Sequence, residues 1–208
     1  MRTLFLTSAG MQVREELFKV LSKSPKETRV AHVITAVRKA RDTAYYEREK
    51  RLLHEARFLV TEIDLEGKTV TQLRRQLADI DVIYVQGGNV FWLLQQVKAS
   101  GFQNVANELI DRGVIYVGAS AGTYLCCPTI AMGLWKGKRE TFGLTNYTGL
   151  SFVPFCVFVH YQPEWSAVVK EKAPSLGYPL RILTDDQALL VRDGAVQLVG
   201  KGSEIVFA

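Results

Sequence analysis

The chain has 208 residues, of which 48% are hydrophobic and 23% are charged, and its formal net charge is +5. This length and composition are ordinary for a soluble enzyme with one sizeable core, so we expect a single domain over residues 1–208. The three cysteines, two of them adjacent, exclude a disulfide framework and lack the spacing of zinc ligands.

The distribution of charge and the lengths of the apolar runs limit where the protein is expected to reside and what it is expected to bind. Basic residues cluster over 38–57 and 136–139. We expect solvated surface there, with an anionic substrate or partner as the alternative, and we expect no nucleic-acid partner. The apolar run in Met1–Thr7 is too short for a signal peptide, and no run is long enough to span a membrane. With free cysteines as well, these features favour the cytoplasm.

Strands and helices are predicted to alternate as far as residue 117. Apolar runs predict strands over Thr3–Thr7, Thr28–Thr35, Phe58–Asp64, Asp81–Val85 and Val114–Val117. Helical spacing predicts helices over Gln12–Leu21, Asp42–Ala56, Val70–Leu77 with Thr69 as its cap, Val90–Ser100 and Phe102–Arg112. This order implies a mostly parallel sheet with helices on both faces.

The last third of the chain has a different pattern. Short strands are predicted over Phe152–Phe158, from Arg181, and over Ala188–Val191, Ala195–Val199 and Glu204–Phe207. Asp193-Gly194 is a hairpin-turn sequence. We expect this part to be an antiparallel extension of the same domain.

The segment Gly118–Gly122 has the pattern G-x-S-x-G between a predicted strand and a segment, Thr123–Cys127, that can open a helix. This is the sequence form of a nucleophile elbow, in which a tight turn presents Ser120 at a helix N-terminus. A side chain at either glycine would clash with the strand or the helix. A small-residue turn with a serine N-cap is the plainer alternative.

A second glycine-containing loop, Gln86–Asn89, also lies between a predicted strand and a predicted helix. Ligands bind beyond the carboxyl ends of parallel strands, so this loop and Ser120 should face one crevice. The N–H groups of Gly88 and Ala121 would then form an oxyanion hole. A phosphate-binding loop is disfavoured because neither G-x-G-x-x-G nor a Walker lysine is present, and a plain tight turn is the other alternative.

His160 follows an apolar strand and is the only histidine after Ser120. A serine hydroxyl needs a base, and histidine suits that role near neutral pH. His32 lies inside a predicted strand and His54 in a charged helix, so we expect both to be buried or surface residues without a catalytic role.

The acid that would orient His160 has several candidates: Glu140, Glu164, Glu171, Asp185 and Asp186. We rank Asp185 first, because it begins a strand expected to neighbour the strand that delivers His160. Glu164 ranks second and the absence of any carboxylate third. A simple turn is the alternative role of Asp185-Asp186.

Together these segments resemble the peptidase E family, the α-aspartyl dipeptidase and cyanophycinase superfamily. Gln86–Leu94 looks like the family's G-G-N-x-F-x-L-L, and Cys127–Ile130 matches the C-P-T-I that ends its nucleophile segment. The resemblance covers nearly the whole chain. It implies a three-layer α/β/α sandwich of the class I glutamine-amidotransferase type, without a metal or an organic cofactor.

The resemblance also implies that Ser120 is the nucleophile and His160 the base, and that Gly88 and Ala121 donate to the oxyanion. We assign Gly87, Asn89 and Glu164 to substrate binding.

Two family features are absent. Ala131–Trp135 has no acid where the aspartyl dipeptidases carry one, and Trp165–Lys172 lacks a G-E-T-R-E-like segment that recognises an N-terminal aspartate. Asp-X dipeptides are therefore not expected to be strongly preferred.

We expect a cytoplasmic serine hydrolase, a dipeptidase E-like peptidase acting on short peptides as a monomer or homodimer. A catalytically impaired protein that binds a peptide or small metabolite is the alternative.

Overall fold

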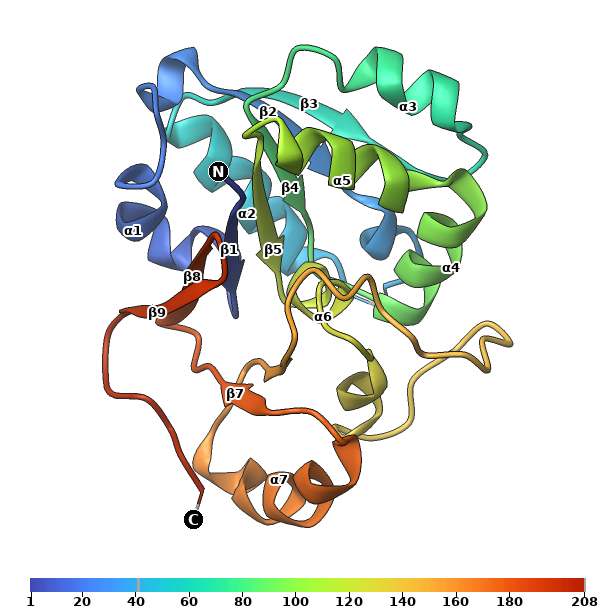
Figure 1. Ribbon diagram of the computed structural model, residues 1–208, viewed down its shortest axis with the longest axis vertical. Coiled ribbons are helices and arrows are strands. Elements are labelled where there is room, and N and C mark those ends of the chain that lie inside the picture. The colour runs from blue at the N-terminus through green and yellow to red at the C-terminus, as the bar shows by residue number, and fades with distance from the viewer. Residues whose placement is uncertain (41, 208) are drawn as a thin grey trace.

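A twisted seven-stranded sheet forms the centre of the computed structural model, which describes residues 1–40 and 42–207 (Figure 1). Its strand order is β3-β2-β4-β5-β1-β8-β9. The strands are β1 (Thr3–Thr7), β2 (Arg29–Val33), β3 (Leu59–Ile63), β4 (Val82–Val85), β5 (Ile115–Ala119), β8 (Gln187–Arg192) and β9 (Ala195–Gly200). The first five in the chain pair in parallel, as predicted.

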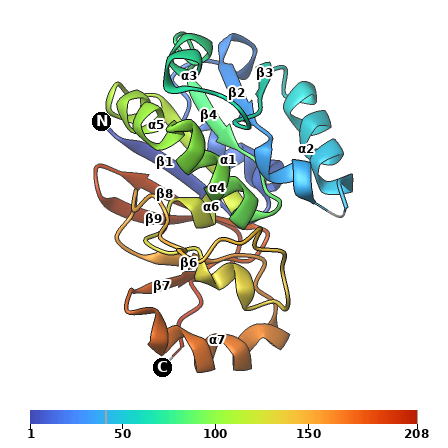
Figure 2. The same cartoon turned by 90° about the vertical axis from the view of Figure 1, so that its right-hand side faces the viewer.

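Helices cover both faces of this sheet, so the predicted three-layer α/β arrangement is confirmed (Figure 2). The α-helices are α1 (Arg14–Phe18), α2 (Ala44–Glu55), α3 (Val70–Gln76), α4 (Val90–Ser100), α5 (Phe102–Asp111), α6 (Ala121–Leu125) and α7 (Ser166–Lys172). Helix α3 begins at the predicted cap: the Thr69 hydroxyl accepts from the Gln72 N–H, and the Gln72 side chain accepts from the Thr69 N–H. Helices α3, α4 and α5 lie on one face, and α1 and α2 pack on the other.

The alternation of side chains along each strand creates a separate core on each face. Leu4 and Leu6 of β1 face the core under α3, α4 and α5, whereas Phe5 faces the core under α1 and α2. All five residues of β1 are buried. A parallel strand packed on both faces is largely apolar, and this is why apolar runs predicted β1, β4 and β5 well. The edge strand β3 is different, since four of its five residues are exposed.

The C-terminal hairpin β8–β9 adds to the sheet beside β1 and is antiparallel to it. Asp193 and Gly194 at its tip have φ values of 45° and 88°, and a two-residue turn of this kind requires positive φ at both positions. The expected antiparallel extension is therefore correct for this hairpin.

The extension is not antiparallel throughout. Strands β6 (Cys156–Phe158) and β7 (Leu180–Ile182) form a separate parallel pair, because α7, a helix that the sequence pattern did not predict, carries the chain back between them. This pair and α7 lie below the main sheet in Figures 1 and 2. Strand β6 is also shorter than predicted. It begins only after Pro154, which has no N–H to donate to a ladder.

The predicted strand over Glu204–Phe207 is wrong. The exposure alternates as in a strand, but Ile205 and Phe207 pack against the core without a strand partner, and the Phe207 ring lies 6.0 Å from that of Tyr161. The predicted helix over Gln12–Leu21 is shortened to α1 and is preceded by a 3-10 turn at Gly10–Val13. Among the described residues, none of the helices has the length and apolar character needed to span a membrane.

The strand order places three functional loops together. Strand β5 pairs with β4 on one side and with β1 on the other, all in parallel, so their carboxyl ends lie at one edge of the sheet. The residues that follow these ends are Ser8, the loop Gln86–Asn89 and Ser120. Such an edge is the usual ligand-binding position of a parallel α/β sheet.

Candidate active site

Ser120 occupies the strained turn expected between β5 and α6. Its φ and ψ are 51° and −100°, a conformation that residues other than glycine rarely adopt. Its N–H donates to the Thr7 carbonyl at 3.1 Å, and its own carbonyl accepts from the N–H groups of Thr123 and Tyr124 at 3.0 Å. These bonds hold the turn in place.

The glycines on either side of this turn are required by close backbone contacts. A Cβ on Gly118 would lie 2.7 Å from the Gly122 carbonyl, and a Cβ on Gly122 would lie 2.2 Å from the Val85 carbonyl oxygen. Both separations are shorter than van der Waals contact. The G-x-S-x-G pattern therefore has a steric cause.

The loop after β4 approaches Ser120 closely. A Cβ on Gly87 would lie 3.1 Å from the Ser120 Cβ, and Gly88, with φ of 145°, packs its Cα against the Ala36 carbonyl. Among the described residues, the N–H groups of Gly88 and Ala121 make no hydrogen bond to a backbone carbonyl. Free N–H groups in this loop and next to Ser120 are what an oxyanion site would require.

Asn89 has a structural role beside this loop. Its Oδ1 accepts from the N–H groups of Phe91 and Trp92 at 2.9 and 3.0 Å and so caps α4. Its Nδ2 donates to the Glu140 carbonyl at 2.9 Å. The amide that we assigned to substrate binding is therefore engaged within the protein, although Asn89 does line the cavity described below.

Ser120, His160 and Asp185 form one hydrogen-bonded chain. The Ser120 hydroxyl is 2.9 Å from His160 Nε2, and His160 Nδ1 is 2.5 Å from Asp185 Oδ1. Ser120 and His160 lie at the ends of β5 and β6, as the sequence indicates. We predicted that Asp185 begins a strand, and this is wrong. Asp185 lies in the loop between β7 and β8.

The parallel pairing of β6 with β7 explains how Asp185 reaches the imidazole. Phe158 pairs with Ile182, and beyond the strands the Tyr161 N–H donates to the Leu183 carbonyl at 3.0 Å. Both chains therefore leave the pair in the same direction. His160 turns out of this pair with φ of 54°, and its ring then lies between Ser120 and Asp185.

Asp185 is held in its ionised form. The hydrogen bond from His160 lowers the pKa of this carboxyl most, partial burial acts in the opposite direction, and the His160 charge, the Ser8 hydroxyl and the Lys136 charge lower it further. An ionised carboxylate accepts from Nδ1–H, so the unprotonated Nε2 faces the serine hydroxyl.

Ser8 is a member of this network that the sequence pattern did not reveal. Its hydroxyl donates to Asp185 Oδ1 at 2.7 Å and accepts from the His160 N–H at 2.7 Å. Ser8 is fully buried just after β1. A polar residue at the carboxyl end of a predicted strand was the available signal, but its use requires knowing that β1 lies next to β5.

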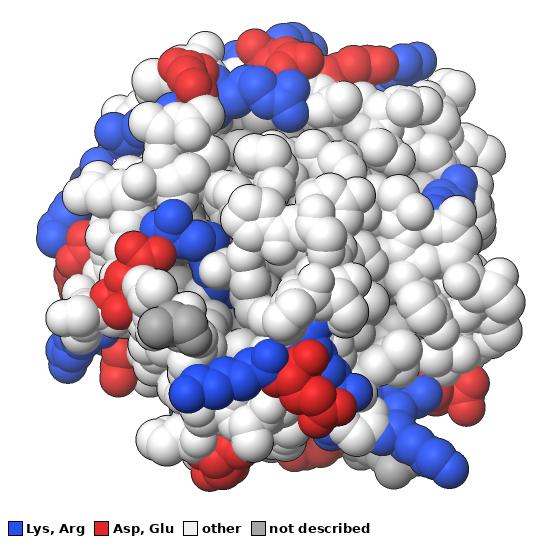
Figure 3. All heavy atoms as spheres, turned by 60° about the horizontal axis from the view of Figure 1, so that its bottom comes forward, with Lys and Arg blue, Asp and Glu red and all other residues white. Residues whose placement is uncertain are grey.

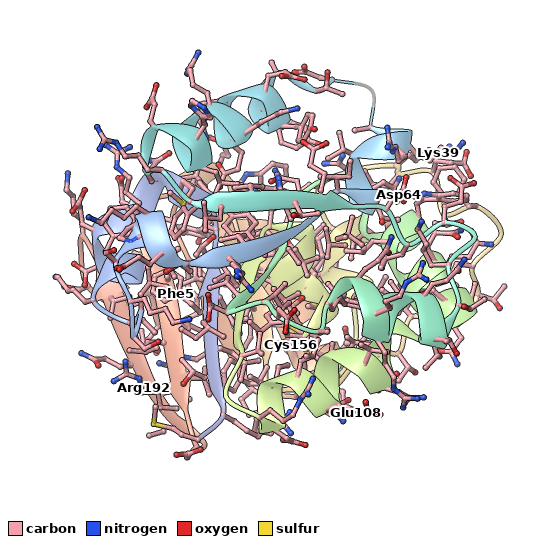
Figure 4. The ribbon with its side chains drawn as sticks, turned by 90° about the horizontal axis from the view of Figure 1, so that it is seen from above. Phe5, Lys39, Asp64, Glu108, Cys156 and Arg192 are labelled. Atoms are coloured by element: carbon pink, nitrogen blue, oxygen red, sulfur yellow. The ribbon has the colours of Figure 1, made fainter. Side chains whose placement is uncertain are left out.

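A cavity of about 600 Å³ opens over this network. Ser8, Gly87, Gly88, Ser120, His160 and Asp185 lie along it. Its other walls carry basic residues from two segments, Lys39 and Arg48, and Lys136, Lys138 and Arg139, together with the acidic residues Asp42, Glu49 and Glu140. Lys39 is labelled in Figure 4 on the turn that follows β2.

On the face shown in Figure 3, the described Lys, Arg, Asp and Glu side chains form small mixed groups around a broad uncharged area. In the described part of the chain, no group of three or more His, Cys, Asp or Glu side chains is arranged to hold a metal ion.

The other acidic candidates lie apart from the imidazole. Glu164 is exposed in a 3-10 turn and does not line the cavity. Glu140 lines the cavity, but its carboxylate accepts from the Phe142 N–H at 3.0 Å. Asp186 accepts from the Gln12 side chain at 3.1 Å.

The remaining histidines also lie away from Ser120. His32 is buried, with Nε2 2.8 Å from Gln86 Oε1, and burial lowers its pKa so that the ring stays neutral. His54 is exposed near the end of α2.

Comparison with known proteins assigns this arrangement to a family. Residues 4–199 match peptidase family S51. The chain belongs to this family. A peptidase of Listeria innocua described as uncharacterized is 31% identical over 202 residues, which cover 94% of this chain and 95% of the relative. Peptidase E of Escherichia coli is 39% identical over a 54-residue segment, 26% of this chain and 24% of that protein.

A solved structure supports the assignment of this S51 chain. A crystal structure from Listeria monocytogenes, of a protein described as a candidate peptidase E, superposes with a TM-score of 0.86 and 28% sequence identity. The match covers 97% of this chain and 100% of the other. The resemblance to peptidase E drawn from the sequence is confirmed.

Proposed function

We propose that this S51 peptidase is a serine peptidase that cleaves short peptides, with Ser120 as nucleophile, His160 as general base and Asp185 as the orienting acid. The observation that carries the proposal is the continuous chain from the Ser120 hydroxyl through both ring nitrogens of His160 to Asp185 Oδ1. These two distances support the roles of nucleophile, base and orienting carboxylate.

The first step is attack on the peptide carbonyl. Ser120 Oγ forms a bond to the carbonyl carbon while its proton passes to His160 Nε2, and Asp185 stabilises the imidazolium that results. Negative charge develops on the carbonyl oxygen, where the N–H groups of Gly88 and Ala121 donate to it. Preorganised donors of this kind account for roughly 10²–10³ in turnover each.

The second step releases the amine and then the acid. His160 returns its proton to the leaving nitrogen as the carbon–nitrogen bond breaks, which leaves an acyl group on Ser120. Water then loses a proton to His160 Nε2 and attacks the same carbon. The Ser120–acyl bond breaks, and the hydroxyl regains its proton.

The cavity supports a short substrate. A volume of about 600 Å³ is within the range of small-molecule sites and is small for a long polypeptide. Basic residues outnumber acidic ones on the cavity walls, which favours a substrate with a negative charge facing Lys39, Arg48, Lys138 and Arg139. A protein that binds peptides without cleaving them is not favoured, because the family assignment is to peptidases.

The free, buried thiols of Cys126, Cys127 and Cys156 fit a reducing compartment, and on this ground we place the enzyme in the cytoplasm.

Substitution of the nucleophile tests this function. We expect Ser120→Ala to reduce turnover of a dipeptide library at least about a thousandfold while the fold is retained. A serine-directed fluorophosphonate should label the wild type at Ser120 and leave the variant unlabelled. Equal turnover by both proteins would show that Ser120 is not the nucleophile.

A further inference from the structure

Lys136 makes contacts that the proposed chemistry does not use. Its Nζ donates to the carbonyl of Val159 at 2.8 Å and to that of His160 at 2.7 Å. The ammonium also lies 4.7 Å from the centroid of the Phe158 ring and 5.1 Å from that of Trp165. These contacts surround the point where the chain turns out of β6 toward the active site.

The turn they surround is strained. His160 has φ of 54°, in the left-handed region that residues other than glycine adopt infrequently. Such a conformation persists only when several contacts with the surrounding structure hold it in place. The Ser8 hydroxyl holds the His160 N–H on one side, and the Lys136 ammonium holds the His160 carbonyl on the other.

We propose that Lys136 is a positioning residue: its ammonium fixes the main chain of His160 so that the imidazole stays in line between Ser120 and Asp185. The inference rests on the proposed function, because it concerns the base of that reaction. The hydrogen bonds are charge-assisted, and a cation enclosed by two aromatic rings and two carbonyls has little freedom to move.

The role also links the cavity wall to the base. Lys136 belongs to the segment that carries Lys138 and Arg139 along the cavity, so one residue joins that wall to the His160 turn. A methionine has a side chain of similar length but gives neither donor nor charge. An arginine keeps the charge and the donors.

Lys136 loses its charge at a lower pH than an ordinary lysine does. Burial lowers the pKa of Lys136 to about 8. The charges of Asp185 and Glu164 raise this pKa, and the charge of Arg139 lowers it further. Above this pH the amine is neutral and its hydrogen bonds to the two carbonyls weaken. Turnover by the wild type should therefore fall as the pH rises through about 8. A guanidinium stays charged throughout this range.

The test compares Lys136→Met and Lys136→Arg with Lys170→Met, a control that removes another lysine over an aromatic ring, on α7 and outside the cavity. We expect Lys136→Met to lower kcat about ten- to a hundredfold with little change in KM, as a small misplacement of a catalytic group does. It should also lose the alkaline fall near pH 8. Lys136→Arg should recover part of kcat and shift the fall to higher pH, and Lys170→Met should behave as the wild type.

Three outcomes would overturn this inference. One is unchanged kcat with the alkaline fall intact in Lys136→Met. Another is a rise in KM alone, which would make Lys136 a substrate contact. The third is equal loss in Lys136→Met and Lys170→Met.

Fluorophosphonate labelling separates the inference from the function on which it rests. If the wild type is not labelled at Ser120, the proposed function fails. If the wild type is labelled and Lys136→Met is labelled at the same rate, with an unchanged melting temperature, only the role of Lys136 fails.

Discussion

Replacing Asp185 by asparagine removes the charge that orients His160 and changes little in shape. In the wild type, Asp185 Oδ1 accepts both from His160 Nδ1 at 2.5 Å and from the Ser8 hydroxyl at 2.7 Å. An asparagine amide that donates to Nδ1 would place the ring proton on Nε2, where it cannot accept the Ser120 proton. The imidazolium formed during attack would also lose its countercharge.

The structure predicts a moderate loss of turnover for Asp185→Asn. A buried triad aspartate is worth about 10⁴ in turnover. Here the side chains of His160 and Asp185 are 40% and 44% exposed, so water replaces part of the lost stabilisation. We therefore expect turnover to fall about 10²- to 10³-fold, which corresponds to about 2.7–4 kcal/mol of transition-state stabilisation.

The assay is steady-state turnover together with the rate of fluorophosphonate labelling, with melting temperatures to show that the variants fold. Asp186→Asn is the matched control, because it removes the neighbouring carboxylate, which accepts only from the Gln12 side chain. Wild-type turnover in Asp185→Asn, or equal losses in the two variants, would refute the assignment of the acid.

Two further predictions concern steric fit and burial. Gly122→Ala should abolish labelling of Ser120 and lower the melting temperature, because its Cβ would lie 2.2 Å from the Val85 carbonyl oxygen; a labelled, stable variant would show that the elbow can relax. Glu49 accepts from the Met11 N–H and the Tyr84 hydroxyl, and burial raises its pKa. Its protonated form therefore contributes folding stability that is complete below the ordinary pKa of 4.5 and is lost as the pH rises through the raised pKa. Glu49→Gln should therefore gain stability relative to the wild type from about pH 4.5 upward in urea unfolding, and a constant difference across this range would contradict the assignment.

Local patterns predicted the parts of the site that depend on neighbouring residues. The turn at Ser120 follows from glycines two residues to either side, and the central strands β4 and β5 follow from apolar runs. His160 was found because it ends an apolar run and because histidine is scarce in this chain.

The remaining features depend on pairing between distant segments. Asp185 reaches His160 because β6 and β7 are parallel, which requires α7 between them, and no sequence pattern predicted that helix. Ser8 joins them because β1 lies between β5 and β8. The alternation at Ile205 and Phe207 was taken for a strand, since a segment packed on a core without strand partners has the same period.

The position of β1 between β5 and β8 also affects when the proposed site can be assembled during synthesis. Strand β1 leaves the ribosome well before its partner β8, which begins at Gln187, and Ser8 bonds a carboxylate 177 residues further along the chain. A nascent chain that ends before Asp185 already carries Ser120 and His160 but has no carboxylate to orient the imidazole. On the proposed function, Ser120 therefore lacks an oriented base until the chain has been made past Asp185, and we expect products truncated before this residue to be poor hydrolases.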